Sequence, residues 1–430
     1  MKKMNLSAGH FEIDITTQNS DEQREFYEIY QLNAFRLINF KAFCDTDWIK
    51  LNHLTLLLGE NSSGKSTLYQ ALGMVSEAYR YLMQEERFTN LSRLAGEFGD
   101  FDDICNKSKS MKVVKIGFQF LRGHQDIEYW ISIAADEANN FGRVADVAGI
   151  QNGHVVDFLS YYQSVNLFFM ERKPDRAIPQ EIQTLAGSCL ESLRSFVQSF
   201  RVLSAHRYRP ERFIQLTGSK PDRMTASGSN AYDILYFLSE IQSKELSEVE
   251  NWLKKFGYSF YWKMSGANRG QFMLRELKTG METNLMDNGF GISQSLPLAL
   301  ALDTLSGGTI LIDTPEAFLQ TKMQSEMGDL LVSGAKKGYV LTETGSEYLT
   351  LRVRRRVAEG KISRGDISVY YLEDTDNQET ICTEIKLDEY GEFQNIPESF
   401  ARFFSSDFQD IEKLDEIRRK KRRYAAENCN

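Results

Sequence analysis

The chain has 430 residues, of which 42% are hydrophobic and 26% are charged, and its formal net charge is −9 at pH 7. The length allows about two or three domains, and the composition is ordinary for a globular protein with a sizeable core. The acidic balance excludes a surface that binds nucleic acid over its whole extent. The longest apolar runs, such as SLPLALAL at 295–302, are far short of a membrane span.

The N-terminal third predicts an extension, then strands, a glycine-rich loop and a helix. Residues 1–30 form the extension, with a strand pattern in HFEIDIT and no apolar stretch typical of a signal peptide. FRLINFKAF and WIKLNHLTLLLG predict strands, and residues 66–85 place apolar side chains at helical spacing. VVKIGFQFLRG and IEYWISIAADE, within 113–137, predict two antiparallel strands.

The rest of the chain predicts helices followed by further strands. Residues 155–255 have a mostly helical pattern, and YSFYWKMSG with GQFMLREL predicts a hairpin after it. TILIDTP and YVLTETG are patterns of short buried strands that end in polar residues. A second hairpin is predicted from ISVYYLED to IKLDEYG, and DFQDIEKLDEIRRKKRRY predicts a terminal helix.

The segment LTLLLGENSSGKST contains the pattern G-x-x-x-x-G-K-S, formed by Gly59, Gly64, Lys65 and Ser66. In such a loop, glycines let backbone N–H groups approach phosphate oxygens, and the following helix N-terminus favours negative charge. A lysine there neutralises phosphate oxygens, and the serine hydroxyl is a ligand of Mg²⁺. The sequence therefore predicts a P-loop that binds ATP with Mg²⁺.

Two acids follow the apolar run of residues 310–312: Asp313 directly, and Glu316 after Thr-Pro. Asp313 lies far from Lys65 in the sequence, so a large insertion must divide the nucleotide-binding core. Between them, MDNGFGISQSLPLALAL has a Gly-x-Gly loop that opens an apolar helix. This loop could present backbone N–H groups to a phosphate, but a helix N-cap at Ser293 would explain it equally well.

In combination, these motifs resemble the ABC-type ATPases of the RecF/SMC/OLD-like superfamily, above all the stand-alone ATPases of prokaryotic anti-phage defence operons. The motifs that carry the resemblance are FRLINFKAF, GENSSGKST, RVLSAHRYRPERF, DNGFGISQSLP, ILIDTPE, GYVLTETGSEYL and IKLDEYGEFQNIPESF. They span roughly residues 32–400, with 85–200 and the tail poorly covered. The resemblance implies an α/β fold: an ABC-type P-loop ATPase head with antiparallel flanking strands, a helical insertion and a small C-terminal extension.

Five regions follow from this resemblance. They are an N-terminal extension (1–30), the first part of the nucleotide-binding core with Walker A (31–85), flanking strands and a helical insertion (86–284), the second part of the core with signature, Walker B and switch (285–365), and a C-terminal hairpin with a basic helix (366–430). Two of them therefore build one nucleotide-binding core from distant parts of the chain.

The resemblance also implies a role for each matching residue. It assigns ATP binding to Lys41, Gly59, Asn61, Gly64, Lys65, Ser66 and Thr67, with Gly291 and Ser293 contacting the ATP of another protomer, and Mg²⁺ binding to Ser66 and Asp313. The implied assembly is a homodimer or larger homo-oligomer, in which two ATP molecules lie between the signature and Walker motifs of facing protomers.

Three positions depart from the family pattern. Thr314 occupies the place of the catalytic glutamate, Gly345 occupies the place of the switch histidine, and residues 96–104 lack the glutamine that commonly joins Mg²⁺. Glu316 and Glu343 are the acids left as candidates for the general base. If neither serves, the site binds ATP and hydrolyses it slowly.

These observations favour an ATP-binding component that senses or scaffolds through nucleotide binding, with weak hydrolysis, and acts on a separate effector in bacterial anti-phage defence. In the families it resembles, that effector is often a nuclease. Two alternatives stay open: a RecF-like DNA-maintenance ATPase that binds DNA, and a non-hydrolysing scaffold in which ATP is structural. We expect a cytoplasmic protein without membrane association, since its five cysteines show no disulfide or zinc spacing.

Three charged segments admit two interpretations each. RVRRR (352–356) and RRKKRR (418–423) are either solvated faces of helices or contacts to a phosphate backbone. The segment His206–Arg212, HRYRPER, is either a functional arm or an ion-paired junction between a strand and a helix. The sequence leaves these interpretations open.

Overall fold

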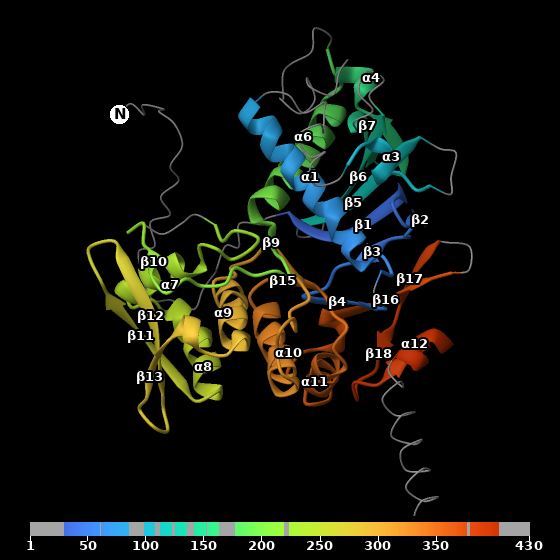
Figure 1. Cartoon of the computed structure of the whole chain (residues 1–430). Coiled ribbons are helices and arrows are strands. Elements are labelled where there is room, and N and C mark those ends of the chain that lie inside the picture. Colours follow the sequence, from blue (N-terminus) through green and yellow to red (C-terminus); the bar gives the residue numbers. More distant parts are fainter. Residues whose placement is uncertain are drawn as a thin grey trace, which may run out of the picture.

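Figure 1 shows the fold of the chain as a computed structural model. The residues it describes are 30–60, 62–85, 99–107, 112–122, 125–135, 142–151, 153–162, 177–218, 223–375 and 379–403. Three predictions fall outside them: the strand in HFEIDIT, Asn61 of the glycine-rich loop, and the terminal helix with its run RRKKRR.

A six-stranded sheet lies at the centre of the fold (Figure 1). Its strands, in order across the sheet, are β17 (Thr380–Glu384), β16 (Ile367–Asp374), β4 (Leu54–Gly59), β15 (Tyr339–Glu343), β14 (Thr309–Asp313) and β9 (Arg201–Leu203). Neighbours from β16 to β9 pair in parallel, whereas β17 is antiparallel to β16. This mostly parallel sheet with an antiparallel edge strand confirms the predicted α/β class.

Helices cover both faces of this sheet, which explains why its strands are continuous apolar runs. Leu57 of β4 belongs to one hydrophobic core, whereas its neighbours Leu56 and Leu58 belong to the other. Figure 1 shows α1 (Lys65–Glu85) and α6 (Gln180–Ser199) on one side of the sheet. On the other side lie α9 (Phe290–Asp303), α10 (Thr321–Ala335) and α11 (Glu347–Ala358).

An antiparallel sheet of seven strands packs beside α1 and α6 (Figure 1). Its strands are β1 (Gln31–Phe40), β2 (Phe43–Asp45), β3 (Ile49–Lys50), β5 (Val113–Arg122), β6 (Gln125–Ala135), β7 (Gly142–Gln151) and β8 (His154–Asp157). Smaller elements are α3 (Phe101–Ile104), α4 (Leu159–Tyr162), α12 (Glu398–Phe403) and the pair β18 (Lys386–Leu387) and β19 (Phe393–Gln394). The seven-stranded sheet supplies the antiparallel flanking strands that the sequence predicted.

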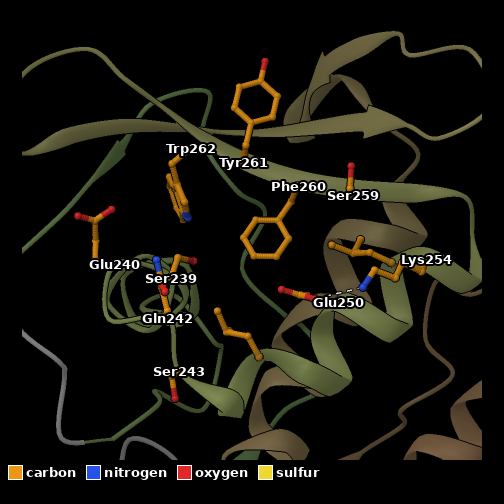
Figure 2. Close-up of a pocket in the computed structure, with 12 residues that line it drawn as sticks. Ser239, Glu240, Gln242, Ser243, Glu250, Lys254, Ser259, Phe260, Tyr261 and Trp262 are labelled. Atoms are coloured by element: carbon orange, nitrogen blue, oxygen red, sulfur yellow. Dashed lines mark hydrogen bonds and ion pairs between the residues drawn. The ribbon is translucent and has the colours of Figure 1, made fainter.

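A four-stranded sheet forms a lobe at the other end of the molecule (Figure 1). It contains β10 (Ile214–Gln215), β11 (Tyr258–Met264), β12 (Arg269–Glu276) and β13 (Glu282–Asn284), and packs with α7 (Ala231–Glu240) and α8 (Ser247–Lys255). The predicted hairpin is β11 with β12. A hollow with a volume of about 570 Å³ lies between β11 and the two helices, and Figure 2 shows the residues that line it.

Part of the range 86–284 belongs to the same central sheet as the nucleotide-binding core. Its strand β9 pairs in parallel with β14, the strand that ends at Asp313. The helices α7 and α8 of the same range pack against α9. The described cysteines form no disulfide bonds with one another. No described helix has the length and apolarity needed to cross a membrane.

Gly59, the last residue of β4, is expected to tolerate no side chain. Its φ is +150°, and a Cβ there would lie 2.4 Å from the carbonyl oxygen of Leu372 and 2.6 Å from Ser63 Oγ. We expect Gly59→Ala to destabilise the fold by about 1–3 kcal/mol, because the backbone of β16 would have to move. Urea unfolding measures this difference.

Gly73→Ala in α1 is the matched control, since a Cβ there meets no atom within 4 Å. An alanine inside a helix is more favourable than glycine by about 0.5–1 kcal/mol, so this variant should be at least as stable as wild type. Equal stabilities of the two variants would contradict the close approach of β16 to Gly59.

Candidate functional site

The P-loop opens a cavity at the carboxyl end of the central sheet. The cavity has a volume of about 360 Å³ and is lined by Ala42, Ser62, Gly64, Lys65, Ser66, Thr67, Thr314, Glu316, Glu343, Thr344 and Gly345. Parallel strands end at the same edge of a sheet, so β4, β14 and β15 deliver the loop and the acids to one place. The structure therefore brings together the Walker A residues and both candidate bases.

Lys65 points back into its own loop. Its Nζ donates to the carbonyl oxygens of Gly59 at 3.0 Å and Glu60 at 2.6 Å. Burial lowers the pKa of Lys65, and the negative charges of Glu343, Glu316 and other nearby acids act in the opposite direction. The ammonium is thus a positive charge at the floor of an otherwise acidic cavity.

Asp313 and Glu343 are paired residues at the ends of β14 and β15. Glu343 is buried, and its carboxylate accepts a hydrogen bond from Ser66 Oγ at 2.9 Å. Burial and the charge of Asp313 raise the pKa of Glu343 to about 7. The acid on β15, which the Walker B motif does not include, is therefore the one in contact with the P-loop serine.

Thr314 lies between these two acids. Its hydroxyl donates to Asp313 Oδ1 at 2.7 Å and lies 3.4 Å from Glu343 Oε1. Its φ is +43°, a left-handed conformation that is unusual for a β-branched residue and costs about 1–3 kcal/mol. The residue at the usual glutamate position thus bridges two carboxylates and cannot itself accept a proton usefully at neutral pH.

Glu316 lines the same cavity but is engaged with the switch loop. Its Oε1 accepts the backbone N–H of Gly345 at 2.8 Å, while its Oε2 is buried without a hydrogen-bond partner among the described residues. Burial raises the pKa of Glu316. The geometry gives Glu316 a role in holding residues 344–345 in place.

Arg207 was not among the predicted site residues, although it belongs to the HRYRPER segment. Its buried guanidinium lies 3.3–3.5 Å from the carbonyl oxygens of Ser204, Asp313, Thr314 and Ala317. Burial lowers its pKa to about 10, so it stays positively charged at neutral pH. It therefore fixes the backbone that carries the Walker B acid.

The rest of the HRYRPER segment forms a local ion-paired junction. Arg212 binds Asp287 through two hydrogen bonds of 2.8 and 2.6 Å, and Tyr208 donates to Glu211 at 2.7 Å. The ion pair of Arg212 supports the interpretation as an ion-paired junction, although the segment joins the strands β9 and β10 and not a strand and a helix. The interpretation as a functional arm stays a prediction. Nothing in the sequence distinguished Arg207 from the other arginines, because three of its four carbonyl partners are more than a hundred residues away.

Lys41 lies in the turn between β1 and β2, beside Ala42 of the cavity wall. Its Nζ donates to Gln70 Oε1 on α1 at 2.9 Å, and burial lowers its pKa. The structure places Lys41 next to the P-loop helix, with its ammonium on the α1 side chain.

Gly291 and Ser293 lie outside the P-loop cavity, in the first turn of α9. The suggestion that Ser293 caps this helix is wrong, because α9 begins at Phe290 with Gly289 as its N-cap. Ser293 is buried, and its hydroxyl donates to the carbonyl oxygen of Phe290 at 2.9 Å. Any contact of this turn with a phosphate has to be made with a nucleotide held outside this chain's own cavity.

Proline at position 297 changes the hydrogen bonding of α9. Pro297 has no N–H, so the carbonyl oxygen of Ser293 lacks its helical donor. Tyr232 Oη of α7 donates to that oxygen at 3.1 Å, and Trp252 Nε1 of α8 donates to Ser295 Oγ at 2.8 Å. The two helices of the four-stranded lobe are therefore hydrogen-bonded to the signature helix.

Exposed aromatic side chains lie at the start of α9. Phe290 and Phe318 contact edge to face with ring centroids 5.1 Å apart, and they are 40% and 55% exposed. The guanidinium of Arg209 lies 6.0 Å from the Phe290 ring. Large exposed aromatic side chains beside an arginine are the composition that protein interfaces favour.

The donor set of the cavity fits Mg²⁺. Ser66 Oγ and Glu343 line the cavity and Asp313 is paired with Glu343 on the neighbouring strand, so all three offer hard oxygen ligands. No cluster of three or more His, Cys, Asp and Glu side chains forms a metal site in the described part of the chain. Mg²⁺ in P-loop sites needs few protein ligands, because phosphate and water oxygens complete its shell.

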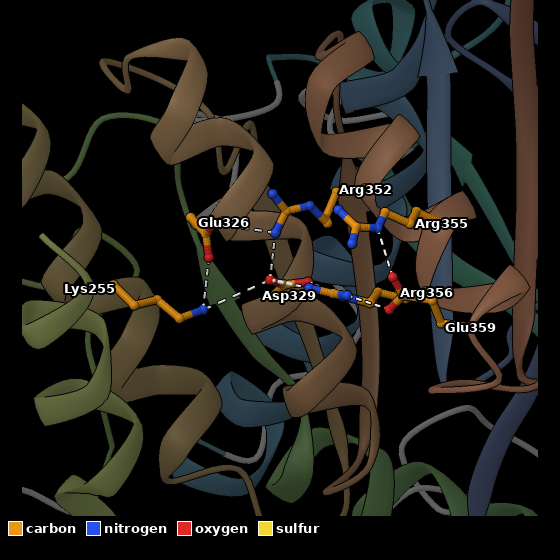
Figure 3. Close-up of polar contacts among 7 residues, drawn as sticks. All are labelled: Lys255, Glu326, Asp329, Arg352, Arg355, Arg356 and Glu359. Atoms are coloured by element: carbon orange, nitrogen blue, oxygen red, sulfur yellow. Dashed lines mark hydrogen bonds and ion pairs between the residues drawn. The ribbon is translucent and has the colours of Figure 1, made fainter.

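Each arginine of the run RVRRR forms an ion pair with an acid, and Figure 3 shows these pairs for Arg352, Arg355 and Arg356. The ion pairs are Arg352 with Glu326 and Asp329, Arg354 with Glu392, Arg355 with Glu359, and Arg356 with Asp329 and Glu359. The pairs of Arg352 and Arg356 with acids of α10 connect α11 to that helix, and Lys255 of α8 joins them through Glu326 at 2.9 Å. The interpretation of this run as part of a helix surface is therefore favoured over a phosphate contact.

No family model and no curated protein matches the sequence. Among solved structures, an SMC head bound to the C-terminal winged-helix domain of ScpA is similar with a TM-score of 0.48 and 11% identity, covering 84% of this chain and 98% of that one. The SMC head domain from Thermotoga maritima has a TM-score of 0.44 and 10% identity, covering 83% and 100%. An SMC head with an extended coiled coil, bound to the C-terminal domain of ScpA from Pyrococcus furiosus, has a TM-score of 0.44 and 12% identity, covering 91% and 100%. These scores are too low to define a function, which has to come from the residues of the cavity.

Asp329→Asn is expected to lower the free energy of unfolding by about 1–2 kcal/mol at neutral pH, because it removes the carboxylate that the half-buried Arg352 and Arg356 share. Burial alone would raise the pKa of Asp329, but its bonds to Arg356 and Arg352 lower it overall. The wild-type advantage is therefore complete above the ordinary aspartate pKa of about 4, and it disappears as the pH falls through the lower folded value. Urea unfolding at about pH 7, 5 and 3 measures this loss.

Glu250→Gln is the control for this measurement, because Glu250 forms an exposed pair with Lys254 one turn away in the same helix. Such pairs contribute about 0.2–0.5 kcal/mol. A destabilisation by Asp329→Asn that is no larger, or that persists unchanged at acidic pH, would contradict the ion-pair network.

Proposed function

We propose that this protein is an ATP-binding, ABC-type ATPase that hydrolyses ATP slowly and acts as a nucleotide-gated dimer. The observation that carries the proposal is the convergence of Lys65, Ser66 and Glu343 on one cavity at the carboxyl end of the central sheet, where Asp313 is paired with Glu343. The loop supplies backbone N–H groups and an ammonium for phosphates, and the acids supply oxygen ligands and a proton acceptor.

The chemistry that we propose is the attack of a water oxygen on the γ-phosphorus. The bond from that phosphorus to the β–γ bridging oxygen breaks, ADP and phosphate form, and the water proton passes to a carboxylate. Mg²⁺ held by Ser66 and Asp313 would neutralise phosphate charge. Lys65 would exchange its two carbonyl partners for phosphate oxygens.

We assign the proton acceptor to Glu343 in preference to Glu316. The Glu343 carboxylate reaches the P-loop serine at 2.9 Å, so it lies beside the place of the γ-phosphate and its metal. Glu316 is bonded to the Gly345 backbone and lies beside the buried Arg207. Because Thr314 and Gly345 replace the usual glutamate and histidine, turnover is expected to be slow.

We further propose that two chains face each other with ATP between them. Gly291 lies in the first turn of α9, outside its own chain's cavity, and exposed Phe290 and Phe318 stand beside it, whereas Ser293 of the same turn is buried. This arrangement supports contact of the α9 turn with the nucleotide of a second copy. Each cavity would then be complete only in the dimer.

The role in anti-phage defence, as a sensor or scaffold for a separate effector such as a nuclease, is proposed from the sequence resemblance alone. A cytoplasmic location belongs to the same proposal. The alternative of a scaffold without hydrolysis is supported by the replacement of the usual glutamate and histidine. The RecF-like alternative gains no support from RVRRR, since its arginines are paired.

Glu343→Gln is expected to reduce ATP turnover by about 100-fold or more while ATP binding persists, because a general base contributes about 10²–10⁴ to the rate. Phosphate release is measured with bound nucleotide on the same samples. Lys65→Ala should lose the nucleotide altogether, because the cavity then has no ammonium for the phosphates.

Glu316→Gln decides between the two acids. If this variant stops turnover and Glu343→Gln does not, the assignment of the base is wrong. If wild type releases no phosphate but retains ATP in a defined oligomer, the scaffold alternative replaces hydrolysis. Wild type that neither binds nor hydrolyses ATP would refute the proposed function.

Phe290→Glu is expected to weaken ATP-dependent dimerisation by about 10-fold or more without weakening ATP binding by the monomer, because a charge would enter the apolar centre of the interface. Analytical ultracentrifugation with and without ATP measures the dimer. Val155→Glu is the control, since Val155 is an exposed apolar residue of β8 on the seven-stranded sheet. Equal dimerisation of both variants would exclude the α9 turn from the interface.

A further inference from the structure

The hollow beside β11 is the larger of the two described cavities and has no part in the nucleotide site. It has a volume of about 570 Å³, against about 360 Å³ for the P-loop cavity. Its walls come from β11, from the end of α7 and the following turn, and from α8 (Figure 2). We call it the β11 groove. The proposed ATPase makes no use of it.

The β11 groove follows the free edge of a strand. Four consecutive residues, 259–262, all line it, although successive side chains of a strand point to opposite faces. Figure 2 shows Phe260 and Trp262 pointing toward the helices, and Ser259 and Tyr261 pointing away. Among the described strands, β11 has β12 as its one neighbour, so its other edge presents backbone N–H and C=O groups without strand partners.

The floor of the groove is apolar and held rigidly. Phe260 stacks on Phe272 with ring centroids 5.0 Å apart, and Trp262 contacts Phe272 and Tyr236 edge to face at 5.2 and 5.3 Å. The side chains of Leu246 and Leu253 line the opposite wall. A rigid aromatic floor of this kind accepts a large apolar side chain at low cost in conformational entropy.

One hydrogen-bond donor in the aromatic floor of the groove is unsatisfied. The indole Nε1 of Trp262 is buried and has no acceptor among the described residues. Leaving a buried donor without a partner costs about 1–3 kcal/mol. A backbone carbonyl oxygen of an occupant is an acceptor of the right kind, and indole N–H groups of buried tryptophans usually have one.

The rim of the groove carries more negative than positive charge. Glu240 is exposed and has no ion-pair partner among the described residues, whereas Glu250 is paired with Lys254 at 3.2 Å. Carboxylates at the rim disfavour phosphates and favour a lysine or arginine side chain. This charge argues against a nucleotide or nucleic acid as the occupant.

From these observations we infer that the β11 groove binds an extended segment of a separate protein, which adds to β11 as a further strand. The segment inserts a large apolar side chain between Trp262 and the leucines of the helices, and it places a basic side chain against Glu240. The inference goes beyond the proposed function and gives the proposed effector a docking site. It does not require ATP hydrolysis.

The groove is physically connected to the signature helix. α7 and α8 form its walls, and these helices donate hydrogen bonds to Ser293 and Ser295 of α9 through Tyr232 and Trp252. A segment that rearranges α7 and α8 on binding would act on the helix whose first turn is proposed to face the second copy.

The test is the selection of random dodecapeptides displayed on phage against the full-length protein without nucleotide, followed by synthesis of the enriched peptides. Enriched peptides should share a large apolar residue near an arginine or lysine. Hydrogen exchange should show that the bound peptide protects backbone amides of β11. The same peptides should bind the Lys65→Ala protein equally well, so failure of the proposed ATPase leaves this result readable.

Two substitutions locate the bound peptide. Glu240→Lys should weaken binding at least 10-fold, whereas Glu389→Lys, an exposed acid in the C-terminal part, should leave it unchanged. Trp262→Phe keeps an aromatic ring but removes the N–H, and it should weaken binding about 3- to 10-fold.

Three results would overturn the inference. They are a failure to enrich any peptide, binding that is indifferent to Glu240→Lys and Trp262→Phe, and the absence of protection along β11. Enriched sequences that match this chain's own residues 418–424 would also overturn it, because they would assign the groove to a second copy.

Discussion

The parallel register between β14 and β15 is the constraint on which the candidate site depends. It pairs Asp313 with Glu343 at the ends of neighbouring strands, and β4 beside them ends at the P-loop. Two carboxylates are thereby placed side by side, and burial together with repulsion by Asp313 raises the pKa of Glu343. The hydroxyls of Ser66 and Thr314 offset part of this repulsion by donating to these acids.

The same constraint explains how the site can lack the usual glutamate. In a parallel sheet, the residue after the Walker B acid and the last residue of the next strand reach the same edge. Glu343 occupies the second position, while Thr314 at the first position binds Asp313. The switch position shows no steric reason for glycine, because a Cβ at Gly345 would meet no atom within 4 Å.

The sequence predicts those parts of the site whose signals are local. The P-loop, the strand before it and the helix after it follow from adjacent residues, as do the runs that end at Asp313 and Glu343. The contact of Glu343 with Ser66 and three of the four carbonyl partners of Arg207 depend on register between distant strands and loops, so no local pattern shows them. The run RVRRR likewise carries no local sign of Asp329, which α10 places beside it.

The signature helix α9 connects the proposed dimer face with the four-stranded lobe. α9 is buried on nearly all sides, and Pro297 removes one of its internal hydrogen bonds, which Tyr232 replaces from α7. Buried Gln294 in the same helix has no partner for either end of its amide among the described residues, at a cost of about 1–3 kcal/mol for each unsatisfied group. The hydrogen bonding of α9 is thus completed by the four-stranded lobe at one point and left incomplete at another. A helix in this condition gains from any rearrangement that satisfies Gln294, and its contacts with α7 and α8 would transmit such a rearrangement to the β11 groove.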